Sequence, residues 1–136
     1  MPYGKIGGVG TISLSTGFSF ENSNPANIIT VDNIVMLCDN VVVTGNYIKD
    51  SVFLTLSSTI MAPASTVRIP IVVYSDDNYE LDILSINTNG EMSINNSFKN
   101  CTIHLNGICW QANSKYYTPD IGNIYPQYFS MDMTGV

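Results

Sequence analysis

The densest group of residues that could do chemistry is acidic and comprises Asp76, Asp77, Glu80 and Asp82, around Asn78. Their oxygens could bind calcium, or a carboxylate pair could cleave a glycosidic bond as in a depolymerase. The run lacks the regular alternation of an EF-hand loop, and a glycosidase needs its two carboxylates across a cleft. We therefore interpret the run as a solvated turn and expect no cofactor.

His104 is the only histidine of the chain. A zinc site would need His104, Cys109 and two distant ligands. No serine lies in a G-x-S-x-G motif, and no glycine-rich phosphate loop is present. These absences favour a protein that binds rather than an enzyme, with His104 as a hydrogen-bonded surface or interface residue.

Composition narrows the range of partners. Eleven Asp and Glu against five Lys and Arg give a net charge of −6, which disfavours nucleic acids and anionic membranes. No apolar run approaches the ~18 residues of a membrane-spanning helix. The cysteines, Cys38, Cys101 and Cys109, are odd in number and form no CxxC. Without a recognisable signal peptide we expect free buried thiols, with one disulfide as the alternative.

Two Asn-Gly pairs lie near the centre of the chain and predict β-hairpins. For Asn89-Gly90, the apolar pattern requires a three-residue loop, 88–90, that pairs Ile86 with Met92. For Asn106-Gly107, a two-residue type I′ turn would pair Ile103 with Trp110 and His104 with Cys109. Ile103, Leu105, Ile108 and Trp110 would then share the core face of the sheet.

The remaining pattern is typical of one all-β domain. Residues 1–10 are glycine-rich and resemble a linker or lead-in, and residues 11–136 are expected to form a single domain. Pro70 interrupts an apolar strand, Val67–Tyr74, which places it on a sheet edge or at a bulge. Turn signals every eight to twelve residues predict an antiparallel β-sandwich, jelly-roll-like, of about eight to ten short strands.

The order of these pieces resembles the C-terminal head domains of bacteriophage tail-fibre and baseplate receptor-binding proteins. The resemblance covers roughly residues 11–112 and rests on turns, glycines and β-branched runs. The segments that carry it are Thr16-Gly17-Phe18, residues 38–45 from Cys38 to Gly45, Arg68-Ile69-Pro70, residues 87–91 from Asn87 to Glu91, and residues 106–110 from Asn106 to Trp110.

The resemblance implies a homotrimer at a phage tail tip, made in the host cytoplasm and carried in the virion. It implies non-enzymatic recognition of a bacterial cell-surface glycan and contacts with other tail or baseplate proteins. A purely structural virion module is the alternative, as is a trimeric C1q or tumour-necrosis-factor-like binding domain. We expect neither nucleic-acid binding nor membrane insertion.

Three loops could carry a ligand site: Asp76–Tyr79, Asn95–Asn100 and Asn113–Tyr128. Loops carry function, and tyrosine combines a flat face with a polar tip. The third loop is the longest, so its residues are the predicted ligand-binding set: Asn113, Tyr116, Tyr117, Tyr125 and Tyr128. Trp110 could also stack on a sugar, but its apolar neighbours favour the core or a subunit interface.

Overall fold

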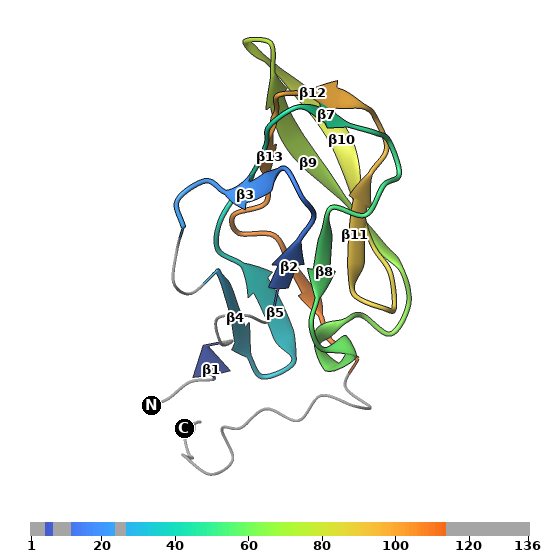
Figure 1. Cartoon of the computed structure of the whole chain (residues 1–136). Helices are drawn as coiled ribbons and strands as arrows, with labels where there is room; N and C mark the ends of the chain where they lie inside the picture. Colours follow the sequence, from blue (N-terminus) through green and yellow to red (C-terminus); the bar gives the residue numbers. More distant parts are fainter. Residues whose placement is uncertain (1–4, 7–11, 24–26, 114–136) are drawn as a thin grey trace.

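The computed structural model describes residues 5–6, 12–23 and 27–113 (Figure 1). This part of the chain is all-β, with one short 3₁₀ turn, η1 (Thr59–Met61), and no helix long and apolar enough to cross a membrane. The strands are β1 (Lys5–Ile6), β2 (Ile12–Leu14), β3 (Phe18–Phe20), β4 (Ile28–Val31), β5 (Ile34–Leu37), β6 (Val41–Val43), β7 (Asn46–Tyr47), β8 (Leu54–Leu56), β9 (Val67–Ser75), β10 (Asn78–Ile86), β11 (Glu91–Ile94), β12 (Phe98–Lys99), β13 (Thr102–His104) and β14 (Cys109–Gln111). The predicted antiparallel β-sandwich is confirmed, with more strands than expected.

The larger sheet has eight strands in the order β2-β8-β11-β10-β9-β13-β6-β3. Its two edge strands, β2 and β3, are consecutive in the chain and joined by a tight turn in which Phe18 N donates to Ser15 O at 3.1 Å. The sheet therefore curls until its edges almost meet. A four-stranded sheet, β1-β4-β5-β14, packs against one end, and β12 pairs with β7 (Figure 1).

The core fills the space between these sheets. Alternation along each strand sends one set of side chains inward, as in β9, where Ile71 and Val73 are buried and Val72 is only partly covered. Three aromatic rings, those of Phe18, Tyr47 and Phe53, lie 6.0–6.1 Å apart. Such edge-to-face and offset ring contacts add to the free energy of burial.

The first predicted hairpin is confirmed in its register and its loop. Ile86 pairs with Met92 and Leu84 with Ile94. Gly90 has φ +79°, as the three-residue loop requires. Asn87 stabilises the turn because its Oδ1 accepts hydrogen bonds from the N–H groups of Asn89 and Glu91.

The second predicted hairpin is wrong. Strand β13 pairs with β6 and β9, whereas β14 pairs with β5 in the other sheet. Residues 105–108 form a turn, closed by Ile108 N donating to Leu105 O, that carries the chain from one sheet to the other. His104 and Cys109 therefore do not face each other across a strand pair. The predicted core face is largely retained: Ile103, Leu105 and Trp110 are buried, and Ile108 is partly buried against the core.

Turn geometry explains this outcome. Of the two central residues, only Gly107 has a positive φ, which fits a type II turn rather than the type I′ turn of a tight hairpin. The Asn40 side chain stabilises this arrangement, since its Oδ1 accepts hydrogen bonds from the N–H groups of Leu105 and Asn106 at 3.0 Å. The acceptor comes from 65 residues upstream, so the local pattern did not contain it.

Pro70 lies in a strand that has a neighbour on both sides over only part of its length. It pairs with Ile83 of β10, but the pairing of β9 with β13 begins only at Val72. One side of β9 is thus unpaired at Pro70. This is how an interior strand accommodates a residue that lacks a backbone donor.

None of the three cysteines, all of which lie in the described part of the chain, is in a disulfide. Cys101 is buried, and burial raises the pKa of its thiol to about 11. Cys109 is exposed and Cys38 is only partly buried, so the expectation of buried thiols holds for Cys101 alone. The position of Cys109 at the outer side of β14, beside the buried Trp110, follows from strand alternation.

Candidate functional site

Of the predicted ligand-binding residues, Asn113 lies in the described part of the chain. Tyr116, Tyr117, Tyr125 and Tyr128 lie outside the described residues. Asn113 follows β14, and its backbone N–H donates to Ala62 O at 2.9 Å. This bond holds the segment after β14 against the loop that follows η1.

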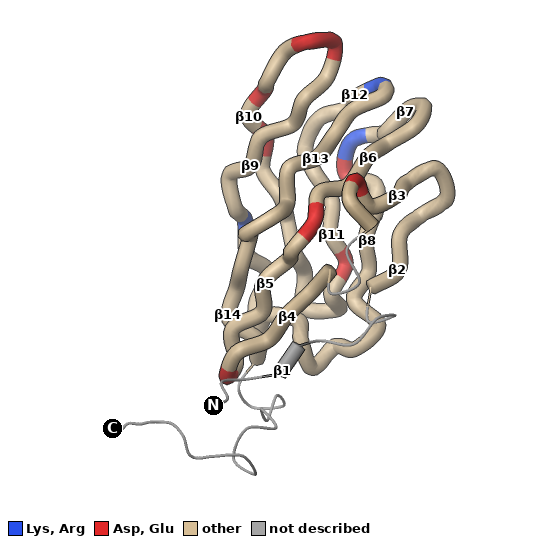
Figure 2. The backbone as a smooth tube through the Cα atoms, turned by 90° about the vertical axis from the view of Figure 1, so that its left-hand side faces the viewer, with Lys and Arg blue, Asp and Glu red and all other residues tan. Residues whose placement is uncertain are grey.

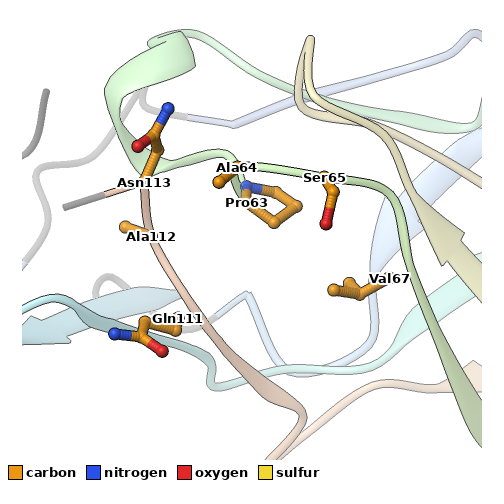
Figure 3. A pocket seen from close by; sticks show the side chains of 7 residues that line it. All are labelled: Pro63, Ala64, Ser65, Val67, Gln111, Ala112 and Asn113. Atoms are coloured by element: carbon orange, nitrogen blue, oxygen red, sulfur yellow. The ribbon is translucent and has the colours of Figure 1, made fainter. Parts of the chain in front are cut away.

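Asn113 lines a hollow of about 330 Å³, which we call the Asn113 groove (Figure 3). Residues from the loop after η1 form one side and residues at the end of β14 form the other. An adjacent hollow of about 250 Å³ adds Thr59, Thr88 and Asn89. The lining of the groove is Pro63, Ala64, Ser65, Val67, Gln111, Ala112 and Asn113. It offers uncharged hydrogen-bonding groups but no aromatic ring among the described residues.

An exposed aromatic cluster lies at the other end of β9. We call it the tyrosine platform, and it consists of Tyr74, Tyr79 and His104. The Tyr74 and Tyr79 rings are 4.8 Å apart between centroids at a tilt of 52°, and the Tyr79 and His104 rings are 6.1 Å apart. The Tyr79 side chain is 71% exposed. Exposed aromatic rings held side by side can stack on the apolar face of a ligand.

Strand register brings these three residues together. Tyr79 of β10 pairs with Tyr74 of β9, and His104 of β13 pairs with Val72, two residues from Tyr74. Residues two apart on a strand point to the same face. The platform therefore belongs to the outer face of three adjacent strands, and Leu81, which is 80% exposed, continues it.

The hairpin of β9 and β10 extends this face beyond the core (Figure 1). Its two-residue turn is Asp76-Asp77, and both residues have positive φ, the geometry of a type I′ turn. Aspartate tolerates this backbone conformation better than most residues. The acidic run thus starts in a hairpin turn, as the solvated-turn interpretation expected.

Asp77 also fixes one ring of the platform. The Tyr74 hydroxyl donates to Asp77 Oδ1 at 3.1 Å. This hydrogen bond and the charge of Asp77 raise the pKa of the Tyr74 hydroxyl. A carboxylate therefore lies at the rim of the platform.

Asp82 has a structural role instead. It is 4% exposed, and its carboxylate accepts hydrogen bonds from the N–H groups of Ile83, Asn95 and Asn96. These bonds tie β10 to the loop after β11. A carboxylate engaged in this way is poorly placed to act as a general acid or nucleophile.

A third hollow connects with the platform at Leu81. It has a volume of about 220 Å³ and combines apolar side chains with Asn95 and Asn96, whose backbone N–H groups are bound to Asp82. Its lining residues are Pro70, Leu81, Asp82, Ile83, Asn95 and Asn96. Two of the three predicted ligand loops, Asp76–Tyr79 and Asn95–Asn100, therefore border one continuous surface.

The sequence contained a signal for this surface that the loop-based prediction missed. In β9, residues 71–74 are all apolar or aromatic, and Tyr79, Leu81 and Ile83 alternate along β10. A strand with apolar residues on both faces has a second face to cover. That face is the platform and its continuation.

No group of His, Cys, Asp and Glu within the described ranges could hold a metal ion. Comparison of the chain with protein-family models, with curated proteins and with solved structures finds no match. The geometry of the site is therefore the basis for the function proposed next.

Proposed function

We propose that this protein is a non-enzymatic binding head that recognises a bacterial surface saccharide. Its setting would be the tail tip or baseplate of a phage virion, in contact with other tail proteins, after synthesis in the host cytoplasm. The observation that carries the saccharide part is the tyrosine platform, with two tyrosine rings 4.8 Å apart on an outer sheet face. Pyranose rings present flat patches of C–H bonds that pack on such rings.

The surface beside the platform supports the same ligand class. Asn95 and Asn96 line the hollow that meets the platform at Leu81. Amides donate and accept hydrogen bonds, as sugar hydroxyl groups require. The strands that present Tyr74 and Tyr79 form a continuous ladder of nine residue pairs, which fixes the backbone positions from which the two rings project.

We propose binding without catalysis because the acidic residues are not arranged as a pair across a cleft. Asp76 and Asp77 are neighbours in one turn, and Asp82 is buried against backbone N–H groups. A glycosidase needs two carboxyl groups on either side of the scissile bond. Incubation with host polysaccharide should therefore give binding without release of oligosaccharide.

Tyr79→Ala should weaken binding of host cell-wall polysaccharide at least about tenfold, or ~1.4 kcal/mol. The melting temperature should stay nearly unchanged, because the Tyr79 side chain is largely exposed. Isothermal titration calorimetry measures the first quantity and a thermal melt the second. Tyr79→Phe keeps the ring and should retain most of the affinity.

Asn113→Ala serves as the matched variant for the Asn113 groove. Asn113 follows β14 but lines the same hollow as Val67, the first residue of β9. The platform lies at the other end of β9. If Asn113→Ala abolishes binding and Tyr79→Ala leaves it intact, the saccharide lies in the groove. If neither variant changes the affinity for any host polysaccharide, the proposal that this surface binds saccharide is wrong.

A structural role without host contact is the second candidate, and it has its own supporting observation. Leu81 and Tyr79 are exposed beside the outward-facing Val72, Ile83 and Pro70, which gives an apolar face for a neighbouring subunit. We propose a homotrimer in either case. Light scattering at dilute concentration should give a particle of about three times the chain mass. A monomer at that concentration contradicts the homotrimer.

A further inference from the structure

The tyrosine platform lies beside the most acidic part of the described surface. Asp76, Asp77 and Glu80 fall within five residues at the tip of the β9–β10 hairpin (Figure 2). Asp77 is on the platform itself, since it accepts the hydrogen bond of the Tyr74 hydroxyl. Strand alternation places Glu80 on the opposite face from Tyr79, so it adds to the field rather than to direct contacts.

Two described basic residues, Arg68 and Lys99, belong to β9 or contact it. Arg68 shares the outer face of β9 but lies six residues before Tyr74, about 20 Å along the strand. The backbone of Lys99 meets the other face of β9, where its carbonyl accepts a hydrogen bond from Ser75 Oγ. On the outer face of β9 the described Arg68 is distant from the rings, whereas the carboxylate of Asp77 lies at their rim and would attract a cationic ligand.

We infer that the tyrosine platform binds a saccharide that carries a free, protonated amine. The inference rests on the proposed saccharide-binding function and adds the ligand class. An ammonium group is attracted to the face of a tyrosine ring. The same group can form a charge-assisted hydrogen bond with the second oxygen of Asp77 while the sugar ring stacks on Tyr79. A neutral sugar gains only the stacking, and a phosphorylated sugar is repelled by the acidic tip.

The test compares two ligands that differ only at the amine. Chitotriose has three free amines, and its N-acetylated counterpart has none. Binding to the full chain is measured by calorimetry at mildly acidic pH, where the amines are protonated, for the wild type and for His104→Gln, so that no charge on the imidazole enters the comparison. We expect chitotriose to bind on the order of tenfold more tightly. Raising the ionic strength should reduce that preference, because an exposed charge pair is screened by salt.

Two matched variants separate charge from stacking. Asp77→Asn keeps an acceptor for the Tyr74 hydroxyl but removes the charge, so it should reduce the preference to the part supplied by the tyrosine rings and leave N-acetylchitotriose binding unchanged. Asp32→Asn makes the same substitution in the turn between β4 and β5 and should change neither affinity. Tyr79→Ala should lower the affinity for both ligands.

Each other outcome overturns a defined part of the argument. Equal affinity for the two ligands, or binding of host polysaccharide without binding of either, overturns the amine assignment and leaves the saccharide-binding function standing. Trilysine binding as tightly as chitotriose overturns the saccharide assignment in favour of a general cation site. Failure to bind these oligosaccharides and every host polysaccharide overturns the proposed function itself.

Discussion

Replacing Trp110 with alanine is expected to lower the free energy of unfolding by about 3–5 kcal/mol, the usual cost of deleting a buried aromatic side chain. The indole is 5% exposed, and Trp110 lies in β14 of the four-stranded sheet. Its Nε1–H donates to Met61 O at 2.7 Å, which joins β14 to η1. The substitution therefore removes both core volume and the bond that holds η1 in place.

Trp110→Phe separates these two contributions. Phenylalanine retains most of the apolar contact but leaves the Met61 carbonyl without its donor, which costs about 1–3 kcal/mol. Urea denaturation followed by circular dichroism measures both variants. An alanine variant that is destabilised by less than the phenylalanine variant would contradict the assignment of Trp110 to the core.

The sequence could predict what depends on nearby residues. The fold class followed from short alternating strands separated by turn residues. The loop at residues 88–90 followed because only one register kept Ile86 and Met92 on the same face. Both of these conclusions depend on contacts within about ten residues. Trp110 was expected in the core because of a pairing with Ile103; the residue is buried, but its strand partner is Val35.

Contacts between distant segments explain the errors. Asn106-Gly107 matched a hairpin turn, but the Asn40 side chain and the backbone of Leu37 bind the turn and divert the chain to the other sheet. The platform was missed for a similar reason. His104 reaches Tyr79 because β13 pairs with β9, about thirty residues earlier in the chain. Tyr74 and Tyr79 are near in sequence, but only the Asp76-Asp77 turn sets their register.

The candidate site was thus predicted in part. The loops at Asp76–Tyr79 and Asn95–Asn100 were both recognised, and they border one surface. Ranking loops by length and tyrosine content placed Asn113–Tyr128 first, because a pattern of loop residues carries no information about an outer sheet face. The predicted loop Asp76–Tyr79 includes Tyr79, but Leu81 and His104 lie within strands and so fall outside a search of loops.

Gly90→Ala should be the most destabilising of the possible glycine-to-alanine changes in the described turns, at about 2–4 kcal/mol. Two effects add. Gly90 has φ +79°, a conformation that costs an alanine about 1–2 kcal/mol. In addition, a Cβ at this position would lie 2.9 Å from Leu56 Cβ. Leu56 cannot easily retreat, because it is buried and its N–H donates to Gly90 O at 2.9 Å.

Gly107→Ala provides the matched control for the steric part of this cost. Gly107 has φ +91°, so alanine meets a comparable backbone penalty there, but an added Cβ has no neighbour within 4 Å. The control should therefore lose about 1–2 kcal/mol, and the difference between the variants should equal the cost of the contact with Leu56. Urea denaturation of both variants measures that difference. If Gly90→Ala is no less stable than Gly107→Ala, the strand β8 does not pack against the 88–90 loop as closely as the register of β8 with β11 requires.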